Sequence, residues 1–334
     1  MEKEKQKEEI MFDIKEFISI MLQAFSSIDE YAKKVKEEKI ENKMFVKEEN
    51  EKYTELDYLT QTFLVNIIQK FYSNLNLKII GEETLNDEYD KIIVDLSNKD
   101  KNEFLSSLNK ISKDKNYNFP NKFNLDSKRL IKINNSEISF FFDPIDGTKS
   151  LLKKKYYPVT TLLGVRIDNN PFIGFIHFVF ARENKTYFNF PSLGIYEYTP
   201  LENKFKKMEI KTDENKFSFV ISSTRATKEM IEFIKTFPNN EYENESGLGT
   251  KMIKCLLEDK IYFTTGKNSC GLWDICAASC LLNELGSDIY CFNGERAKFV
   301  PKKILFESNG VICINKKKLE KFLENVKKYY SQNI

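Results

Sequence analysis

The chain has 334 residues, of which 41% are hydrophobic and 13% aromatic, so it can bury a large core and is not disordered as a whole. Its 52 basic residues nearly balance its 50 acidic ones, which gives no electrostatic reason to expect a nucleic-acid polymer as partner. The longest apolar stretch, around residues 172–180, is too short to span a bilayer, and residues 1–10 lack the apolar core of a secretory signal. We therefore expect a cytoplasmic monomer, without a membrane partner, that folds as two domains or subdomains.

Helices and then strands are predicted in the N-terminal part of the chain. Apolar spacing predicts helices at residues 9–37, at residues 55–72 and near residues 101–111. Thr54 is the candidate N-cap of the second helix. Strands are predicted at residues 77–80, 138–142, 159–167, 172–180 and 186–199, the last three as an antiparallel sheet. Residues 86–136 are rich in Lys, Asn and Asp, and we expect them to form an insertion.

Predicted strands and helices alternate in the C-terminal part. Strands are predicted at residues 217–222, 260–265, 288–292 and 310–315. Helices are predicted at residues 228–236, 248–257, 273–285 and 316–330. The pattern predicts an α/β protein with an α+β domain over residues 1–213 and an α/β domain over residues 214–334.

Histidine and cysteine chemistry is largely excluded. The single histidine, His177, lies in an apolar strand-like run where a core role is favoured, and triad catalysis needs a positioned imidazole. The six cysteines contain no C-x-x-C pair, which favours reduced, buried thiols over a zinc site. An enzyme built on this chain must therefore rely on carboxylates or on a metal.

The most informative motif is Asp-Pro-Ile-Asp-Gly-Thr at residues 143–148, directly after the apolar strand 138–142. The proline fixes one backbone dihedral and the glycine permits a tight turn, so Asp143 and Asp146 can converge on one hard cation such as Mg²⁺. The Ile145 carbonyl offers a further oxygen ligand. The same residue types also dominate ordinary turns, so the motif alone does not decide between a turn and a site.

The N–H groups of Gly147 and Thr148 open the segment that follows the motif and can point at an anion. A second anion-facing helix start is predicted at Gly247-Leu-Gly-Thr-Lys251, with Lys251 toward an anionic substrate. This run has neither the dinucleotide fingerprint nor the spacing of a Walker loop.

Further carboxylates stand at the ends of predicted elements. Glu82 follows a strand and a glycine, Asp274 opens a helix, and Asp57 lies early in the second helix. Each also has a simpler interpretation, as a solvated turn residue or as a charge favoured by a helix dipole. Together with Asp143 and Asp146, they could hold about two to three Mg²⁺ ions around one phosphate.

Three segments together resemble a known family. Gly81-Glu-Glu83, residues 143–148 and Trp273-Asp-Ile-Cys-Ala277 resemble the signatures of the lithium-sensitive, magnesium-dependent phosphatases related to inositol monophosphatase. The resemblance implies a layered αβαβα sandwich with the active site between its two parts. It implies metal ligation by Glu82, Asp143, the Ile145 carbonyl, Asp146 and Asp274. It further implies that Asp57 and Thr148 orient and deprotonate the attacking water.

The long insertion between Glu83 and Asp143 resembles two larger branches, the 3'(2'),5'-bisphosphate nucleotidases and the inositol polyphosphate 1-phosphatases. The nucleotidase branch is favoured by the run Asp-Gly-Thr-Lys149, by the short connection from Lys149 to Val159 and by the run Ser222-Ser-Thr-Arg225. This resemblance implies Li⁺-inhibited removal of the 3'-phosphate from adenosine 3',5'-bisphosphate, and from its phosphosulfate analogue, by metal-activated water. Its implied substrate contacts are Gly147, Thr148, Lys149, Thr224, Arg225 and Lys251. Thr224 stands where some nucleotidases have a stacking histidine, which leaves the adenine contacts open.

Two alternatives remain open for the function. An inositol polyphosphate 1-phosphatase, or an enzyme with both activities, would use the same metals with a different recognition shell. A phosphate sensor without turnover would keep the fold but would have no need of Asp57 and Thr148.

Overall fold

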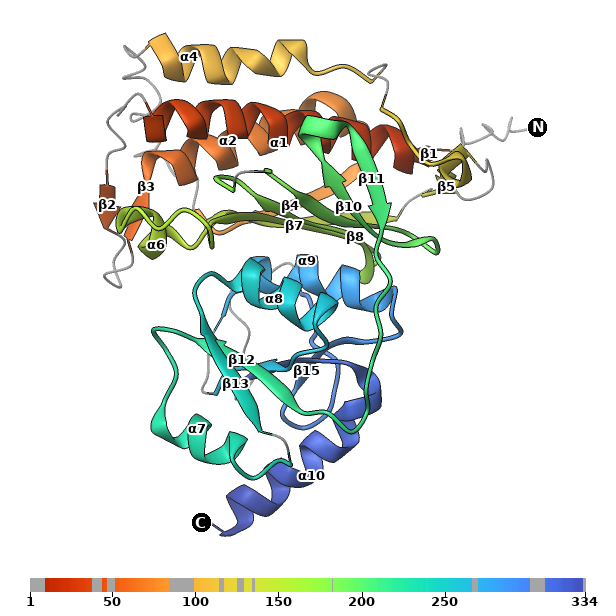
Figure 1. Ribbon diagram of the computed structural model, residues 1–334. Coiled ribbons are helices and arrows are strands. Elements are labelled where there is room, and N and C mark those ends of the chain that lie inside the picture. The colour runs from red at the N-terminus through yellow and green to blue at the C-terminus, as the bar shows by residue number, and fades with distance from the viewer. Residues whose placement is uncertain are drawn as a thin grey trace, which may run out of the picture.

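The computed structural model describes residues 10–37, 44–46, 52–83, 99–113, 117–124, 129–133, 136–181, 183–238, 240–265, 270–300 and 310–332. These residues form alternating layers of helices and sheets, from α1 and α2 at one end to α7 and α10 at the other (Figure 1). The predicted layered α/β sandwich is thereby confirmed. Within the described ranges, no helix has the length and apolar character needed to cross a membrane.

The first layer, at the N-terminal end, consists of α1 (Ile14–Glu37) and α2 (Glu55–Tyr72), and α4 (Lys99–Ser106) lies on its outer side. The first helix begins later than predicted because Met11–Asp13 form the short strand β1, which pairs with β5 (Leu130–Lys132). The short strands β2 (Met44–Val46) and β3 (Lys52–Thr54) form a hairpin before α2. Of the predicted insertion at residues 86–136, residues 86–98, 114–116, 125–128 and 134–135 lie outside the described residues.

The second layer is a seven-stranded sheet with the order β11-β10-β9-β8-β7-β6-β4. Its strands are β4 (Asn76–Gly81), β6 (Glu137–Asp146), β7 (Thr160–Ile167), β8 (Asn170–Phe178), β9 (Thr186–Phe190), β10 (Gly194–Thr199) and β11 (Lys204–Lys207). All neighbours pair antiparallel except β4 and β6, so the predicted antiparallel sheet is confirmed. The predicted strand at residues 186–199 is two strands, because the chain turns between them, with Ser192 at φ 65°.

The third layer, α8 (Leu248–Leu257) and α9 (Leu272–Asn283), covers the other face of this sheet (Figure 1). The approach of α9 is very close. A Cβ atom added to Gly164 of β7 would stand 2.5 Å from the Cys276 sulfur, and one added to Gly174 of β8 would overlap the Ala277 carbonyl. The absence of side chains at these two glycines therefore allows α9 to pack close against the sheet.

The C-terminal strands form the fourth layer. β12 (Ser218–Ser222) pairs parallel with β13 (Glu241–Glu245), and a bridge between Phe219 and Ile261 leads on to β14 (Tyr262–Phe263). β14, β16 (Val311–Ile314) and β15 (Asp288–Cys291) pair antiparallel. The helices α7 (Lys228–Ile234) and α10 (Lys316–Gln332) form the fifth layer. The predicted alternation is confirmed, although β13 was missed, and the division at residue 213 stays a prediction.

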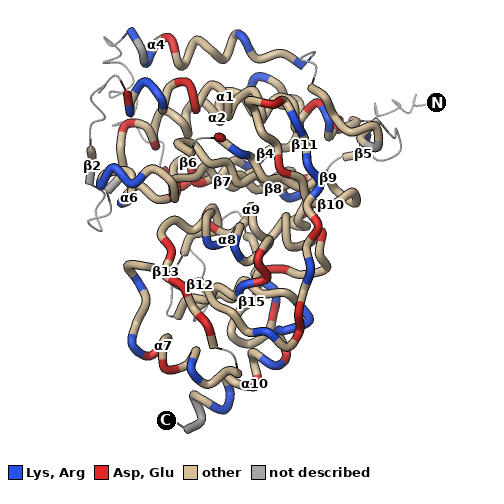
Figure 2. The backbone as a smooth tube through the Cα atoms, in the orientation of Figure 1, with Lys and Arg blue, Asp and Glu red and all other residues tan. Residues whose placement is uncertain are grey.

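Three buried clusters fill the spaces between successive layers. His177 is fully buried in the first space: its Nε2 contacts Asp29 Oδ1 at 2.8 Å and its Nδ1 contacts Thr186 Oγ1 at 2.9 Å. The core role predicted for His177 is therefore confirmed. The net charge is +2, and basic and acidic residues are interspersed along the backbone of both halves (Figure 2).

Candidate active site

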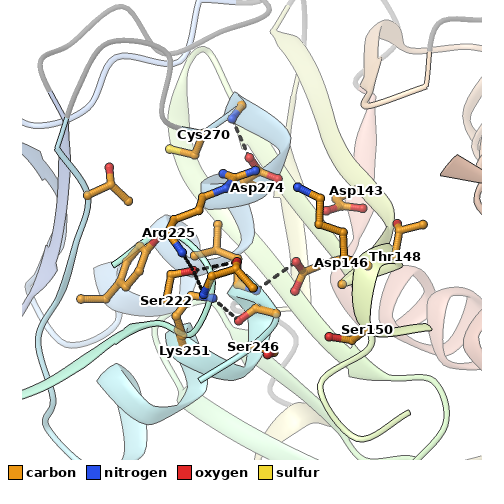
Figure 3. Close-up of a pocket in the computed structure, with 18 of the residues that line it drawn as sticks. Asp143, Asp146, Thr148, Ser150, Ser222, Arg225, Ser246, Lys251, Cys270 and Asp274 are labelled. Carbon is orange, nitrogen blue, oxygen red and sulfur yellow. Dashed lines mark hydrogen bonds between the residues drawn. The ribbon is translucent and has the colours of Figure 1, made fainter. Parts of the chain in front are cut away.

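A cavity of about 520 Å³ lies where the end of β6 meets the first turns of α8 and α9. It brings together predicted residues from five separate segments of the chain (Figure 3). The predicted site residues that line it are Glu82, Asp143, Ile145, Asp146, Gly147, Thr148, Lys149, Thr224, Arg225, Lys251 and Asp274. Asp57 does not line the cavity, but it contacts a residue that does.

Residues 143–148 combine the end of a strand with a turn. The sequence left open whether this motif is an ordinary turn or part of a site, and the structure shows a turn that also lines the cavity. β6 pairs with β7 up to Asp143, and the register then shifts before Asp146. The Ile145 N–H donates to Asp143 Oδ1 at 3.0 Å, which fixes that carboxylate against its own turn. Gly147 follows with φ 93°, a left-handed conformation that favours glycine, and α6 (Thr148–Leu152) begins there.

Asp57 and Thr148 are joined by a hydrogen bond across the wall of the cavity. The Thr148 hydroxyl lies 2.8 Å from Asp57 Oδ1 and 2.9 Å from the Ile145 carbonyl. Asp57 Oδ2 accepts from the Thr54 N–H at 2.8 Å and from the Thr54 hydroxyl at 2.5 Å, so Oδ1 is left to face Thr148. Burial raises the pKa of Asp57 to about 6, with the nearby Glu82 charge acting in the same direction.

Asp146 connects the first sheet to α8. Its Oδ1 accepts from the Leu248 N–H at 2.9 Å, and its Oδ2 accepts from the Gly249 N–H at 2.7 Å. The Thr160 hydroxyl donates to Oδ2 at 2.9 Å. Asp146 therefore satisfies the first N–H groups of α8 from a strand 102 positions earlier in the chain. The predicted start of α8 at Gly247 is confirmed, but its Leu248 and Gly249 N–H groups bond to Asp146, so they are not the free, anion-facing groups that the sequence predicted.

Glu82 is held through its neighbour in the chain. The buried Gln61 side chain accepts from the Glu83 N–H at 2.9 Å and donates to the Glu83 carbonyl. The Glu82 N–H in turn donates to the Phe142 carbonyl at 3.1 Å. Gly81 is required here, because a Cβ atom at this position would overlap the Gln61 amide oxygen.

Asp274 stands in the first turn of α9, where its Oδ2 accepts from the Gly271 N–H at 2.6 Å. The capping interpretation of Asp274 is thus confirmed, and the residue still lines the cavity. Figure 3 shows the Arg225 side chain reaching from the β12 side toward Asp274. Burial, and then the charge of Glu82, raise the pKa of Asp274 to about 8.

The carboxylates of the cavity repel one another. Burial raises the pKa of Asp143 well above its usual range, and the charges of Glu82, Asp146 and Asp274 raise it further. This oxygen-rich, like-charged donor set fits a hard divalent cation, which would relieve the repulsion. Among the described residues, no group of three or more Asp, Glu, His or Cys side chains is placed so that it could hold a metal ion as it stands, so the carboxylates would have to move closer together around a cation.

Cationic side chains line the cavity beside the carboxylates. Lys149 and Arg225 are exposed, whereas Lys251 is 4% exposed and donates from Nζ to the Gly247 carbonyl at 2.6 Å. Burial lowers the pKa of Lys251, while the charge of Asp146 acts in the opposite direction. The Thr224 hydroxyl is exposed and lies 3.4 Å from the Ser222 hydroxyl. These groups give the cavity anion-binding capacity apart from any metal.

Sequence reasoning missed several residues of the site. Ser246, Tyr262 and Trp273 line the cavity, and Gln61 supports it from behind. Trp273 precedes Asp274 within a motif, which was an available signal. Gln61 lies four residues after Asp57 on the same face of α2, a weaker signal that the sequence alone did not separate from helix packing.

The sequence matches the inositol monophosphatase family over residues 13–331. The chain belongs to this family. Curated relatives named inositol monophosphatase 3 are 26% identical over 192 residues in Xenopus tropicalis and 29% identical over 174 residues in Danio rerio. These alignments cover 54% and 49% of this chain, and 50% and 46% of the two relatives. The chain thus spans about half the length of the curated relatives it matches.

Solved structures of family members share the fold. A staphylococcal IMPase-I complexed with products has a TM-score of 0.63 and 14% identity, covering 93% of this chain and 95% of that chain. An IMPase/NADP phosphatase complexed with Mg²⁺ and phosphate has a TM-score of 0.62 and 13% identity, with coverage of 93% and 95%. At this identity the likeness shows the fold alone, a layered α/β sandwich.

Proposed function

We propose that this member of the inositol monophosphatase family is a divalent-metal-dependent phosphomonoesterase. One observation carries the proposal: Glu82, Asp143, Asp146 and Asp274 share one cavity, whose wall holds the hydrogen-bonded pair of Asp57 and Thr148. No histidine or cysteine nucleophile is needed for such chemistry, since the attacking group is a water molecule.

The pair of Asp57 and Thr148 would move the proton of that water. Because Thr54 occupies Asp57 Oδ2, the remaining oxygen is aimed at the Thr148 hydroxyl. When that hydroxyl donates to Asp57, its lone pairs can accept a hydrogen bond from water in the cavity. A pKa of about 6 suits Asp57 to act as a base near neutral pH. A sensor without turnover would not need this arrangement.

Glu82, Asp143, Asp146, Asp274 and the Ile145 carbonyl are the residues that would hold Mg²⁺, about two to three ions in the family's manner. Bound Mg²⁺ supplies charge neutralisation at phosphoryl oxygens and a lowered pKa of bound water. The complexes of relatives with Mg²⁺ and with LiCl support a metal-dependent, lithium-sensitive activity for this chain.

For the substrate, we favour a small molecule with two phosphate groups, such as adenosine 3',5'-bisphosphate, cleaved at the 3' position to AMP. Lys149, Arg225 and Lys251 support this choice, since they offer positive charge for a phosphate that is not being cleaved. A cavity of about 520 Å³ is within the usual range for ligands of this size. The second candidate is an inositol phosphate, which the names of the relatives favour.

Phosphate release from three substrates tests these assignments: adenosine 3',5'-bisphosphate, inositol 1,4-bisphosphate and inositol 1-phosphate. We expect Mg²⁺-dependent release that EDTA abolishes and Li⁺ inhibits, with the highest kcat/KM for the nucleotide. Asp143→Asn is the matched control, and it should be inactive while remaining folded. Release from none of the three substrates would refute the phosphatase proposal, and a preference for an inositol compound would refute the nucleotide.

A further inference from the structure

Gln61 makes a paired contact that the proposed chemistry does not use. It lies on α2, is 2% exposed, and its side-chain amide matches both polar groups of the Glu83 backbone. The amide oxygen accepts from the Glu83 N–H at 2.9 Å, while the amide nitrogen donates to the Glu83 carbonyl. A primary amide offers a donor and an acceptor in one plane, and this contact uses both.

The contact fixes the segment that follows β4, in which Glu83 is buried. β4 is an edge strand whose residues are only partly buried, and the last described residue after it is Glu83. β6 holds the segment on one side, through the bond from the Glu82 N–H to the Phe142 carbonyl. Gln61 holds it from α2, and its amide lies so close to Gly81 that a Cβ atom at position 81 would overlap the amide oxygen.

Gln61 also lies one helical turn after Asp57, so the same rigid helix carries both residues. Asp57 is bonded to Thr148, and Thr148 to the Ile145 carbonyl. The position of Glu82 is thereby tied to that of the pair proposed to activate water, through a single element rather than through a loop.

We infer that Gln61 is a positioning residue for the metal centre: its two hydrogen bonds to the Glu83 backbone set the Glu82 carboxylate relative to Asp57 and Asp143. The inference rests on the proposed function, because it assumes that Glu82 ligates a metal. Loss of a group that orients a metal ligand typically weakens metal binding by about 10- to 100-fold.

The chain offers a matched control on another helix. Gln23 of α1 is 5% exposed, and its side chain donates to the Ser112 carbonyl at 2.7 Å and accepts from the Ser112 N–H at 3.2 Å. This is the same type of clamp, on a backbone that does not line the cavity. Gln61→Met and Gln23→Met both keep side-chain volume while removing the amide, so their costs in stability should be similar.

The test is Mg²⁺ binding without substrate. Trp273 is the single tryptophan of the chain and lines the cavity next to Asp274, so its fluorescence reports binding directly. Mg²⁺ is titrated into the metal-free unsubstituted protein and both variants, with calorimetry as a second measurement. We expect Gln61→Met to raise the Mg²⁺ dissociation constant about tenfold or more, and Gln23→Met to leave it unchanged.

Equal Mg²⁺ affinity in Gln61→Met and the unsubstituted protein would overturn the inference while leaving the proposed function intact. An equal loss of Mg²⁺ affinity in Gln61→Met and Gln23→Met would also overturn the inference, because a general loss of stability would then explain both results. If the unsubstituted protein binds no Mg²⁺, the proposed function itself fails. Should Gln61→Met not fold, Gln61→Asn replaces it, with Gln23→Asn as its control, since the shorter side chain keeps the amide but moves it away from the Glu83 backbone.

Discussion

Replacing Asp146 should destabilise the metal-free protein, whereas replacing Asp143 should not. Asp146 accepts hydrogen bonds from the Leu248 and Gly249 N–H groups and from the Thr160 hydroxyl, so Asp146→Ala leaves three donors without this acceptor. Loss of a helix cap costs about 0.5–2 kcal/mol, and a hydrogen bond to a charged group about 1.5–3 kcal/mol. Because these contributions overlap, we expect a loss of about 3 kcal/mol in the free energy of unfolding.

Asp143 is expected to behave in the opposite way. Its pKa is raised by burial and by the neighbouring carboxylates, Glu82 foremost. A carboxyl group whose pKa rises on folding contributes its full stability at pH values below its unfolded pKa, and this contribution is lost as the pH rises through the folded pKa. Folding therefore disfavours the ionised form of Asp143 in the metal-free protein, and Asp143→Asn, which cannot ionise, should leave the stability unchanged or raise it.

Urea unfolding in the presence of EDTA measures both effects, and thermal melting provides a second measure. A loss of about 3 kcal/mol corresponds to a fall in Tm of roughly 4 °C for a chain of this size, because the entropy of unfolding is about 2.1 cal/mol/K per residue. Asp146→Asn keeps one acceptor oxygen and should lie between Asp146→Ala and the unsubstituted protein. The reasoning is refuted if Asp146→Ala is as stable as the unsubstituted protein, or if Asp143→Asn loses as much as Asp146→Ala.

Three further outcomes are expected. Thr148→Val removes the hydroxyl bonded to Asp57 and should lower kcat for phosphate release about 100-fold or more. The Mg²⁺ affinity should be unchanged. An unaltered kcat would contradict the role of Thr148 in proton transfer. Arg225→Gln should raise KM for a bisphosphate about tenfold but leave KM for a monophosphate unchanged, and equal effects on both would argue against a second phosphate at this residue. His177→Leu removes the histidine partner of half-buried Asp29 and should cost about 3 kcal/mol in urea unfolding without changing kcat. Full stability of this variant would disprove the structural role.

Local patterns in the sequence predicted much of this protein because they depend on neighbouring residues. The apolar run before Asp143, the turn residues after it and the helix start at Gly247 were all predicted and found. β13 was missed because its residues, Glu-Tyr-Glu-Asn-Glu, carry no apolar alternation. It becomes a strand only because β12 supplies a parallel partner, which no local pattern records.

Contacts between distant segments could not be predicted in the same way. The bond from the Leu248 N–H to Asp146 joins positions 102 residues apart, and the paired bonds of Gln61 to Glu83 require a side-chain rotamer as well as a fold. The family resemblance predicted which residues make up the site, but it did not predict these hydrogen bonds. The roles of the individual site residues stay predictions until the variants above are measured.

The close approach of α9 to the first sheet has a consequence for how this sequence can change over time. Gly164 and Gly174 carry no functional group and lie away from the cavity, yet Asp274 is attached to the helix whose height above the sheet they determine. A single added methyl group at either position must lift α9 or distort it, and would carry Asp274 away from Asp143. We therefore expect substitutions at Gly164 and Gly174 to be tolerated as poorly as substitutions at the carboxylates themselves.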